Sequence, residues 1–233
     1  MKIGIIGPSE DEIAPFMQDI EKRAEHRHAK LLIHDGLYAG VPVAAVFSGV
    51  GKVNAAIATQ VLIDRLAVTH IILTGVAGGL DAQLAIGDVV IATEVAHHDV
   101  AHEVLTEYHP WMQDIYFQAD KTLLEYSLHA ATPFHCHCGR IISGEAFIQG
   151  EDRQRLVEIF TPLCVDMESA SVAQVCHANG IPFAIVRVIS DMACADAAQI
   201  FEEQIHAASL RALQVVKGVV RQFGSVRSTH SVM

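Results

Sequence analysis

The fold class is decided by the stretch His70-Ile71-Ile72-Leu73-Thr74-Gly75-Val76-Ala77-Gly78-Gly79. Its first five residues form an apolar, largely β-branched run, which predicts a buried strand at 70–74. The three glycines that follow allow close backbone approach to a ligand, and a tight turn is the alternative interpretation. In open α/β sheets, ligands bind beyond the carboxyl ends of strands, where this glycine-rich segment would lie.

Outward from this stretch, apolar strand-length runs alternate with amphipathic helical segments. Strands are expected at 2–6, 29–38, 41–47, 70–74, 88–95, 136–142, 164–166 and 183–190. Helices are expected from the N-cap Ser9 to about Glu25, and at 51–66, 121–131, 154–160, 169–179 and 202–223. The segment 97–117 fits neither pattern. The alternation predicts one α/β domain over residues 1–223, followed by a loose polar tail at 224–233.

Composition excludes several classes of protein. The chain has 233 residues, 51% of them hydrophobic, and 27 acidic against 16 basic residues give a net charge of −11. So negative a chain is a poor binder of nucleic acid or anionic membranes. Its apolar runs are too short to span a bilayer, and the start of the chain has no signal-peptide pattern. Five cysteines without framework spacing predict reduced thiols and a cytoplasmic location.

The run His135-Cys136-His137-Cys138 suggests a metal site. Alternate residues of a strand point to opposite faces, however, so at most two of these side chains could share one ion. No second pair of ligands occurs at zinc-finger spacing. Neither a metal nor another cofactor is therefore expected.

Two acidic clusters follow predicted strands. Residues 10–12 read Glu-Asp-Glu after the first strand, where negative charge also complements a helix N-terminus. Later, Asp166 and Glu168 flank Met167 at the end of an apolar strand. A soft apolar surface beside carboxylate acceptors suits a sugar or nucleoside, with a helix-start glutamate as the simpler interpretation.

The last predicted strand carries a further polar cluster. Arg187 lies inside this apolar strand, and a buried arginine is rare without an anionic partner. Ser190 and Asp191 follow at the strand end. There Asp191 could meet a ligand, or either residue could cap the next helix.

The motifs together resemble the bacterial 5′-methylthioadenosine/S-adenosylhomocysteine nucleosidases of the purine nucleoside phosphorylase/uridine phosphorylase superfamily. The resemblance is carried, in order, by 1–7 with Glu12, and by 48–56, 74–80, 86–90, 143–148, 166–170 and 187–191. It extends over almost the whole chain, to about Phe223. It implies a single-domain, three-layer α/β/α fold with a central mixed, partly barrel-like sheet. It also implies a homodimer that acts on a small-molecule nucleoside without a cofactor.

The resemblance implies hydrolysis of the N-glycosidic bond between adenine and a 5′-thio-substituted ribose, with 5′-deoxyadenosine as a further candidate substrate. Asp191 would be the general acid at adenine N7, and Glu12 the general base for water. The implied substrate-binding residues are Gly78 along the base and sugar, Phe147 and Ile148 on adenine, Met167 and Glu168 on the ribose, Arg187 beside water and Glu12, and Ser190 and Val76.

Two positions favour a hydrolase over a phosphorylase. Hexameric purine phosphorylases carry an arginine and a serine where this chain has Leu73 and Val76. The nucleosidases also usually have serine at the position of Val76, and segment 99–117 departs from the family pattern around the 5′-substituent. Alternatives are a futalosine or aminodeoxyfutalosine hydrolase, another nucleoside hydrolase or phosphorylase of the superfamily, and a nucleoside-binding protein without catalysis.

Overall fold

The computed structural model describes residues 1–194 and 196–230. The strands are β1 (Ile3–Gly7), β2 (Glu21–His28), β3 (Leu31–Tyr38), β4 (Val41–Phe47), β5 (His70–Gly79), β6 (Val89–His97), β7 (Phe117–Gln118), β8 (Cys136–Ser143), β9 (Cys164–Asp166) and β10 (Phe183–Asp191). The helices are α1 (Glu10–Met17), α2 (Lys52–Leu66), α3 (His102–Thr106), α4 (Lys121–Ala130), α5 (Glu151–Phe160), α6 (Ser169–Asn179) and α7 (Ala197–His230).

The strands form one mixed sheet that closes partly into a barrel. Its order is β10-β6-β8-β9-β5-β1-β4-β3-β2, and β7 pairs with β6. Because β10 also pairs with β5, the strands β10, β6, β8, β9 and β5 form a closed ring. Strand β5 is parallel to β10, whereas β6 is antiparallel to it. The predicted mixed, partly barrel-like sheet is confirmed.

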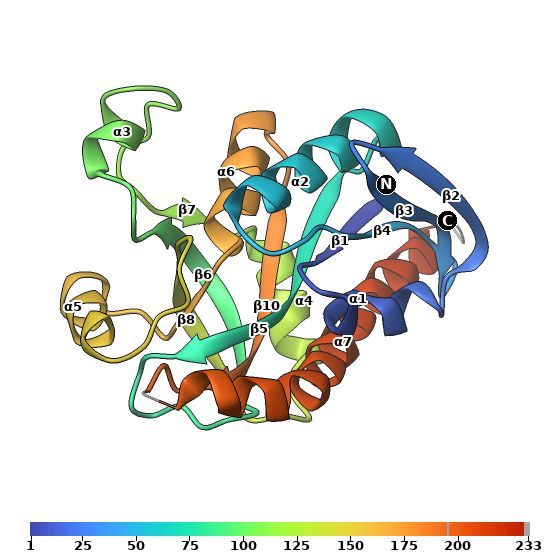
Figure 1. Ribbon diagram of the computed structural model, residues 1–233. Coiled ribbons are helices and arrows are strands. Elements are labelled where there is room, and N and C mark those ends of the chain that lie inside the picture. The colour runs from blue at the N-terminus through green and yellow to red at the C-terminus, as the bar shows by residue number, and fades with distance from the viewer. Residues whose placement is uncertain (195, 231–233) are drawn as a thin grey trace.

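Helices cover the sheet on both sides, which gives the predicted three layers (Figure 1). Helices α2 and α6 contact each other on one side, and α7 contacts both α1 and α4 on the other. Two buried apolar clusters fill the spaces between these layers. Isoleucine, valine and leucine dominate the strands in both clusters, as expected for strands buried on both faces.

Three predicted boundaries are wrong. Helix α1 ends at Met17 rather than near Glu25, and the charged run after it forms β2 at the edge of the sheet. Exposed charge of this kind protects a sheet edge from pairing with other chains. Strand β5 continues through Gly79, so the glycine-rich segment is strand and not a tight turn. The predicted loose tail is helical as far as His230, and residues 231–233 lie outside the described residues.

The other predicted elements occur with small shifts of their ends. Strands β3 and β4 form the expected hairpin, in which Tyr38 faces Val41. Segment 97–117, which the sequence left unassigned, contains the one-turn helix α3 and reaches β7. Among the described residues, no helix is both long and apolar enough to cross a membrane.

Candidate active site

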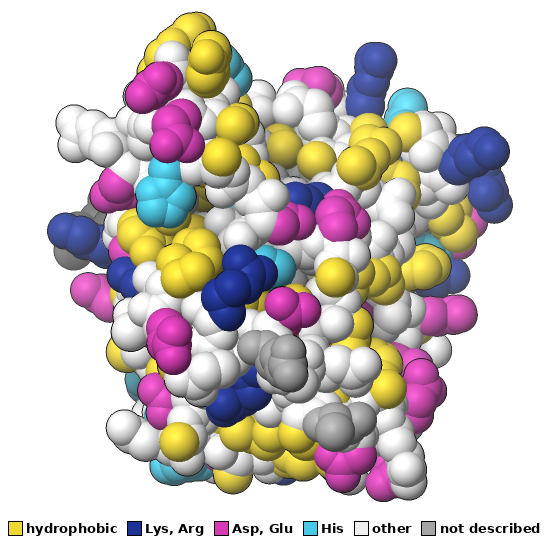
Figure 2. Space-filling view, turned by 60° about the vertical axis from the view of Figure 1, so that its left-hand side comes forward, with side chains coloured by type: hydrophobic (Ala, Val, Ile, Leu, Met, Phe, Trp, Pro, Cys, Tyr) yellow, Lys and Arg dark blue, Asp and Glu magenta, His cyan; other side chains and the backbone are white. Residues whose placement is uncertain are grey.

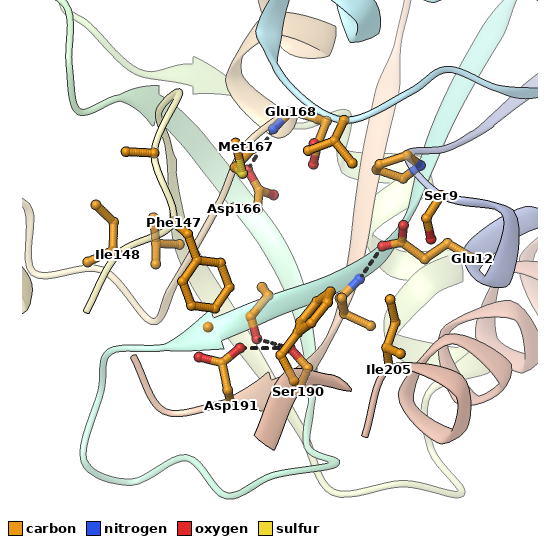
Figure 3. A pocket seen from close by; sticks show the side chains of 18 residues that line it. Ser9, Glu12, Phe147, Ile148, Asp166, Met167, Glu168, Ser190, Asp191 and Ile205 are labelled. Carbon is orange, nitrogen blue, oxygen red and sulfur yellow. Dashed lines mark hydrogen bonds between the residues drawn. The ribbon is translucent and has the colours of Figure 1, made fainter. Parts of the chain in front are cut away.

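A cavity of about 280 Å³ opens where β5, β9 and β10 end. Carboxylates enter it from separate sides, with Glu12 and Asp191 apart and Glu168 near Met167, while the Phe147 ring points inward (Figure 3). The full lining comprises Pro8, Ser9, Glu12, Val50, Val76, Ala77, Gly78, Ala146, Phe147, Ile148, Val165, Asp166, Met167, Glu168, Ser190, Asp191, Phe201 and Ile205. The structure therefore brings together all the predicted site residues except Arg187, which lies behind the wall.

Glu12 is the buried member of the acidic cluster at the start of α1. It is 4% exposed, whereas Glu10 and Asp11 face solvent. The backbone N–H of Val76 donates a 2.9 Å hydrogen bond to Glu12 Oε1. Burial raises the pKa of Glu12, against the opposing effects of Arg187 and of this hydrogen bond. The helix-dipole interpretation therefore suits Glu10 and Asp11, whereas Glu12 is the member of the cluster that lines the cavity.

Arg187 holds two carboxylates at the end of β9. Its side chain is fully buried, and its Nε donates to Asp166 Oδ2 at 2.8 Å while Nη2 donates to Glu168 Oε2 at 3.0 Å. Its Nη1 is 3.8 Å from Glu12 Oε1 and makes no hydrogen bond among the described residues. The anionic partners expected for a buried arginine are therefore present, but Arg187 supports the cavity wall instead of lining it.

Glu168 is held from two directions at the start of α6. Its Oε1 accepts a 2.9 Å hydrogen bond from the backbone N–H of Gly51, which is far away in the sequence. Burial raises the pKa of Glu168 to about 7, although Arg187 opposes the rise. The carboxylate is thus fixed in place, with its acceptor oxygens beside the cavity.

The sequence pattern marks Asp166 with Glu168 as a carboxylate acceptor at a strand end, but it assigns Asp166 no role of its own. It accepts hydrogen bonds from the hydroxyls of Ser143 and Ser169 and from the backbone N–H groups of Glu168 and Ser169. With Arg187, these donors saturate a carboxylate that is 7% exposed. Asp166 therefore positions Glu168 and Arg187. The buried arginine was the only sequence signal for this role.

Asp191 stands at a β-bulge in β10. The register with β5 shifts between Ile189, which faces Ala77, and Asp191, which faces Gly78, so that Ser190 is the extra residue. Bulges next to active sites commonly redirect a side chain. Ser190 Oγ donates to Asp191 Oδ2 at 2.9 Å. Burial raises the pKa of Asp191, and this hydrogen bond and that from the Ala193 N–H only partly oppose the rise.

The glycines of β5 give the carboxylates room. A Cβ atom at Gly78 would lie 3.1 Å from Asp191 Oδ1. At Gly75, a Cβ atom would collide with both Glu12 Oε1 and Arg187 Nη1, and φ there is +151°. The sequence predicts that these glycines let the backbone approach a ligand closely. In the structure they also let the backbone approach the side chains of Glu12, Arg187 and Asp191.

We expect Gly75→Ala to lower kcat/KM by about 10²-fold or more, because even a small displacement of catalytic groups is costly. The matched control is Gly180→Ala, which also has a positive φ, of +64°, but has open space around its Cβ position. The control should lose only the backbone strain of a left-handed residue, roughly 1–2 kcal/mol of stability. Steady-state kinetics and thermal melts of the two variants distinguish a local collision from backbone strain alone.

Segment 99–117 does not line the cavity within this chain. Asp99 instead accepts hydrogen bonds from Lys52 Nζ and the backbone N–H of Glu145. The one tryptophan of this segment, Trp111, is 68% exposed and does not line the cavity. The aromatic residues at the cavity are Phe147 and Phe201, whose ring centroids are 6.0 Å apart. Phe201 and Ile205 come from α7 and had no sequence signal.

Fold and site together define an α/β protein with an acidic cavity at the strand ends of a partly closed barrel, and comparison with known proteins identifies its family. A family model described as "Phosphorylase superfamily" matches residues 2–221. A 5′-methylthioadenosine/S-adenosylhomocysteine nucleosidase of Halalkalibacterium halodurans is 35% identical over 96% of this chain and 99% of its own. The nucleosidase of the same name from Oceanobacillus iheyensis is 36% identical, over 95% of this chain and 100% of its own.

Solved structures give the same result. A nucleosidase of this name from Neisseria meningitidis, in complex with methylthio-immucillin-A, matches with a TM-score of 0.89 and 33% identity, over 95% of this chain and 99% of the other. A futalosine hydrolase of Helicobacter pylori matches with a TM-score of 0.88 and 27% identity, over 95% and 98%. The chain belongs to the Phosphorylase superfamily and, within it, to the 5′-methylthioadenosine/S-adenosylhomocysteine nucleosidases.

Proposed function

We propose that this enzyme hydrolyses the N-glycosidic bond of 5′-methylthioadenosine and S-adenosylhomocysteine, and that 5′-deoxyadenosine is a further substrate. One observation carries the proposal. Four buried carboxylates, those of Glu12, Asp166, Glu168 and Asp191, line one cavity, and none of the described residues lining it is lysine or arginine. A phosphate dianion would meet repulsion there, whereas a neutral nucleoside and a water molecule would not.

In the proposed reaction, Glu12 takes a proton from water as the water oxygen attacks C1′ of the ribose. The C1′–N9 bond breaks, and its electron pair goes to adenine. Asp191 donates a proton to N7, so that adenine leaves as a neutral base. Acting as an acid at neutral pH requires the raised pKa that burial gives to Asp191.

Other side chains would stabilise the positive charge that develops on the ribose. Glu168 would accept hydrogen bonds from the 2′ and 3′ hydroxyls, and these bonds strengthen as the charge grows. Met167 would lie against the ribose, Phe147 would stack on adenine, and the Ile148 backbone would bind its amino edge. Arg187 lies behind the cavity wall with its Nη1 3.8 Å from Glu12 Oε1, so it would help to orient Glu12 and, through Glu12, the attacking water.

Product analysis tests the proposal. 5′-Methylthioadenosine is incubated with the enzyme in the presence and absence of phosphate, and the products are separated by chromatography. Adenine and free methylthioribose should form in both reactions. A phosphorylated sugar that appears only with phosphate would make the enzyme a phosphorylase. Futalosine and aminodeoxyfutalosine are assayed in parallel, and faster turnover of either would replace the proposed substrate. Binding of these nucleosides without turnover would instead identify the chain as a nucleoside-binding protein without catalysis.

Glu12→Gln should lower kcat by about 10²–10⁴-fold, because an amide cannot accept the proton from water. The matched control is Glu10→Gln, in the same first turn of α1 but exposed to solvent. The control should keep the wild-type rate. Equal losses in both variants would mean that charge near the helix N-terminus matters, and not a base at Glu12.

We also propose a homodimer, built on the face that carries α2 and α3. Val53 on α2 is 68% exposed, and Ile57 on α2 and Val104 on α3 are also exposed hydrophobic residues. At the upper left of Figure 2, hydrophobic side chains cover the tip of the projecting segment around α3, and acidic side chains lie below them. Val50 is 52% exposed and also lines the cavity, so a partner on this face would cover the cavity rim.

Val53→Glu tests the dimer, because a buried unpaired charge would oppose association. Analytical ultracentrifugation should give a dimer for the wild-type chain and a larger monomer fraction for the variant. A monomeric wild-type chain would overturn the dimer.

We also propose a cytoplasmic location, for which the five free cysteines provide support.

A further inference from the structure

We propose that Asp88, His135 and His137 bind one divalent transition-metal ion of the zinc type, at a site outside the catalytic cavity. None of these three residues lines the cavity. His135 Nδ1 lies 2.9 Å from Asp88 Oδ1, and His137 Nε2 lies 3.3 Å from Asp88 Oδ2. The three potential ligand atoms all lie within 4.8 Å of one another.

The neighbouring strands β6 and β8 create this cluster. They run parallel, and Val89 faces Cys136, so the residues just before them, Asp88 and His135, are also neighbours (Figure 1). His137 lies two positions after His135, and side chains at that spacing share one face of a strand. Cys136 packs against an apolar cluster instead. The sequence argument that at most two residues of 135–138 could share an ion therefore holds, and the third ligand comes from a distant segment.

The donor set decides the kind of ion. Two imidazole nitrogens and one carboxylate oxygen suit zinc and neighbouring first-row ions, whereas magnesium and calcium prefer oxygen ligands alone. Tetrahedral zinc with bonds of ~2.1 Å places its ligand atoms roughly 3.4 Å apart, which small rotations of the two rings would achieve. Asp88 is nearly buried, while the His135 side chain is 71% exposed and leaves an entry path for the ion. The net charge of −11 favours cations near the protein.

A bound ion would act on the strand that carries Asp191. The backbone carbonyl of Asp88 accepts a 2.9 Å hydrogen bond from the N–H of Ile189, and the Gly87 N–H donates to the Ile189 carbonyl at 2.8 Å. Ile189 lies directly before the bulge that contains Ser190. The ion would therefore link Asp88, in the segment before β6, to the two histidines at the start of β8. Because Gly87 and Asp88 are hydrogen-bonded to Ile189, the ion would also help to hold the end of β10. Its proposed role is to stabilise this part of the barrel.

Zn²⁺ titration of the untagged protein tests the site. Isothermal titration should give one equivalent of bound Zn²⁺, and Co²⁺ should give the visible absorption bands of a bound ion. The double variant His135→Gln/His137→Gln removes two partly exposed ligands, and it should weaken binding by about 10²-fold or more. The control His129→Gln, an exposed histidine on α4, should bind like the wild type.

Thermal melts give a second readout that does not depend on activity. Zn²⁺ should raise the Tm of the wild type and of His129→Gln, but not that of the double variant, because binding to the folded state stabilises it. Equal Zn²⁺ affinity in the double variant and the wild type would overturn the site. So would the absence of Zn²⁺ binding by the wild type, in which case the two histidines only form hydrogen bonds with Asp88.

Discussion

Asp191→Asn should lower kcat by about 10²–10⁴-fold, which is the usual contribution of general acid catalysis. Asparagine matches aspartate in size. Its Oδ1 can accept the hydrogen bond from the Ala193 N–H, and its Nδ2 can donate to Ser190 Oγ, which is the donor in the wild type. It has no acidic proton to give to N7. Because only the transition state needs that proton, the Kd for 5′-methylthioadenosine should stay close to the wild-type value.

The pH profile separates this role from a structural one. Burial raises the pKa of Asp191, so the protonated, active form persists to higher pH than for an ordinary aspartate and is lost as pH rises through that pKa. The wild-type kcat/KM should therefore fall on the alkaline side. Asp191→Asn should lack this fall. The pKa of Glu12 is also raised, and its base function should be lost as pH falls through it.

The matched control for this variant is Asp64→Asn, an exposed aspartate on α2. It should keep wild-type kcat and the wild-type pH profile. Near-normal turnover of Asp191→Asn, or an unchanged alkaline limb, would exclude Asp191 as the general acid.

Local sequence patterns predict the layers of the fold well and its long-range contacts poorly. Apolar runs and alanine-rich helices gave the correct order of most elements, because burial on both faces leaves a clear pattern. The charged run 21–28 was predicted to continue the first helix, since a polar edge strand has no apolar alternation to reveal it. The glycine-rich end of β5 was open to a turn interpretation because its pairing partners, β9 and β10, come far later in the chain.

The same limit applies to the site. The clusters that contain Glu12, Glu168 and Asp191 were predicted because each follows a strand, where an α/β fold places ligands. The family resemblance then singled out these three residues within the clusters. Phe201 and Ile205 were missed because they depend on how α7 crosses the cavity. The partners of Arg187 could be expected as anionic, yet nothing local identified Asp166 and Glu168 as those partners or placed the arginine behind the cavity wall.

Arg187→Met should lower the free energy of unfolding by about 3–5 kcal/mol, since removing one partner of a buried ionic cluster leaves uncompensated charge. Asp166 would lose the Nε–H bond, Glu168 would lose the Nη2–H bond, and two nearly buried carboxylates would face each other without a cation. Methionine fills much of the space, so the cost arises from charge more than from a void.

For a chain of this size, that loss corresponds to a Tm lower by roughly 6–20 °C. The control Arg155→Met removes an arginine whose ion pair with Asp152 is 3.8 Å long and largely exposed, and it should change stability by less than about 0.5 kcal/mol. The loss should shrink at lower pH. Without the arginine, protonation of Glu168 and its neighbours removes the repulsion, and the folded state takes up those protons more readily than the unfolded chain.

Arg187→Lys should restore only part of the stability. An ammonium group supplies the charge but not the planar fork that reaches Asp166 and Glu168 through separate nitrogens. The Lys variant should therefore melt between the Met variant and the wild type, with Glu168 less well fixed and a higher KM. A Met variant as stable as the wild type would show that the carboxylates at the end of β9 do not require this cation. The only remaining role for Arg187 would then be its contact with Glu12.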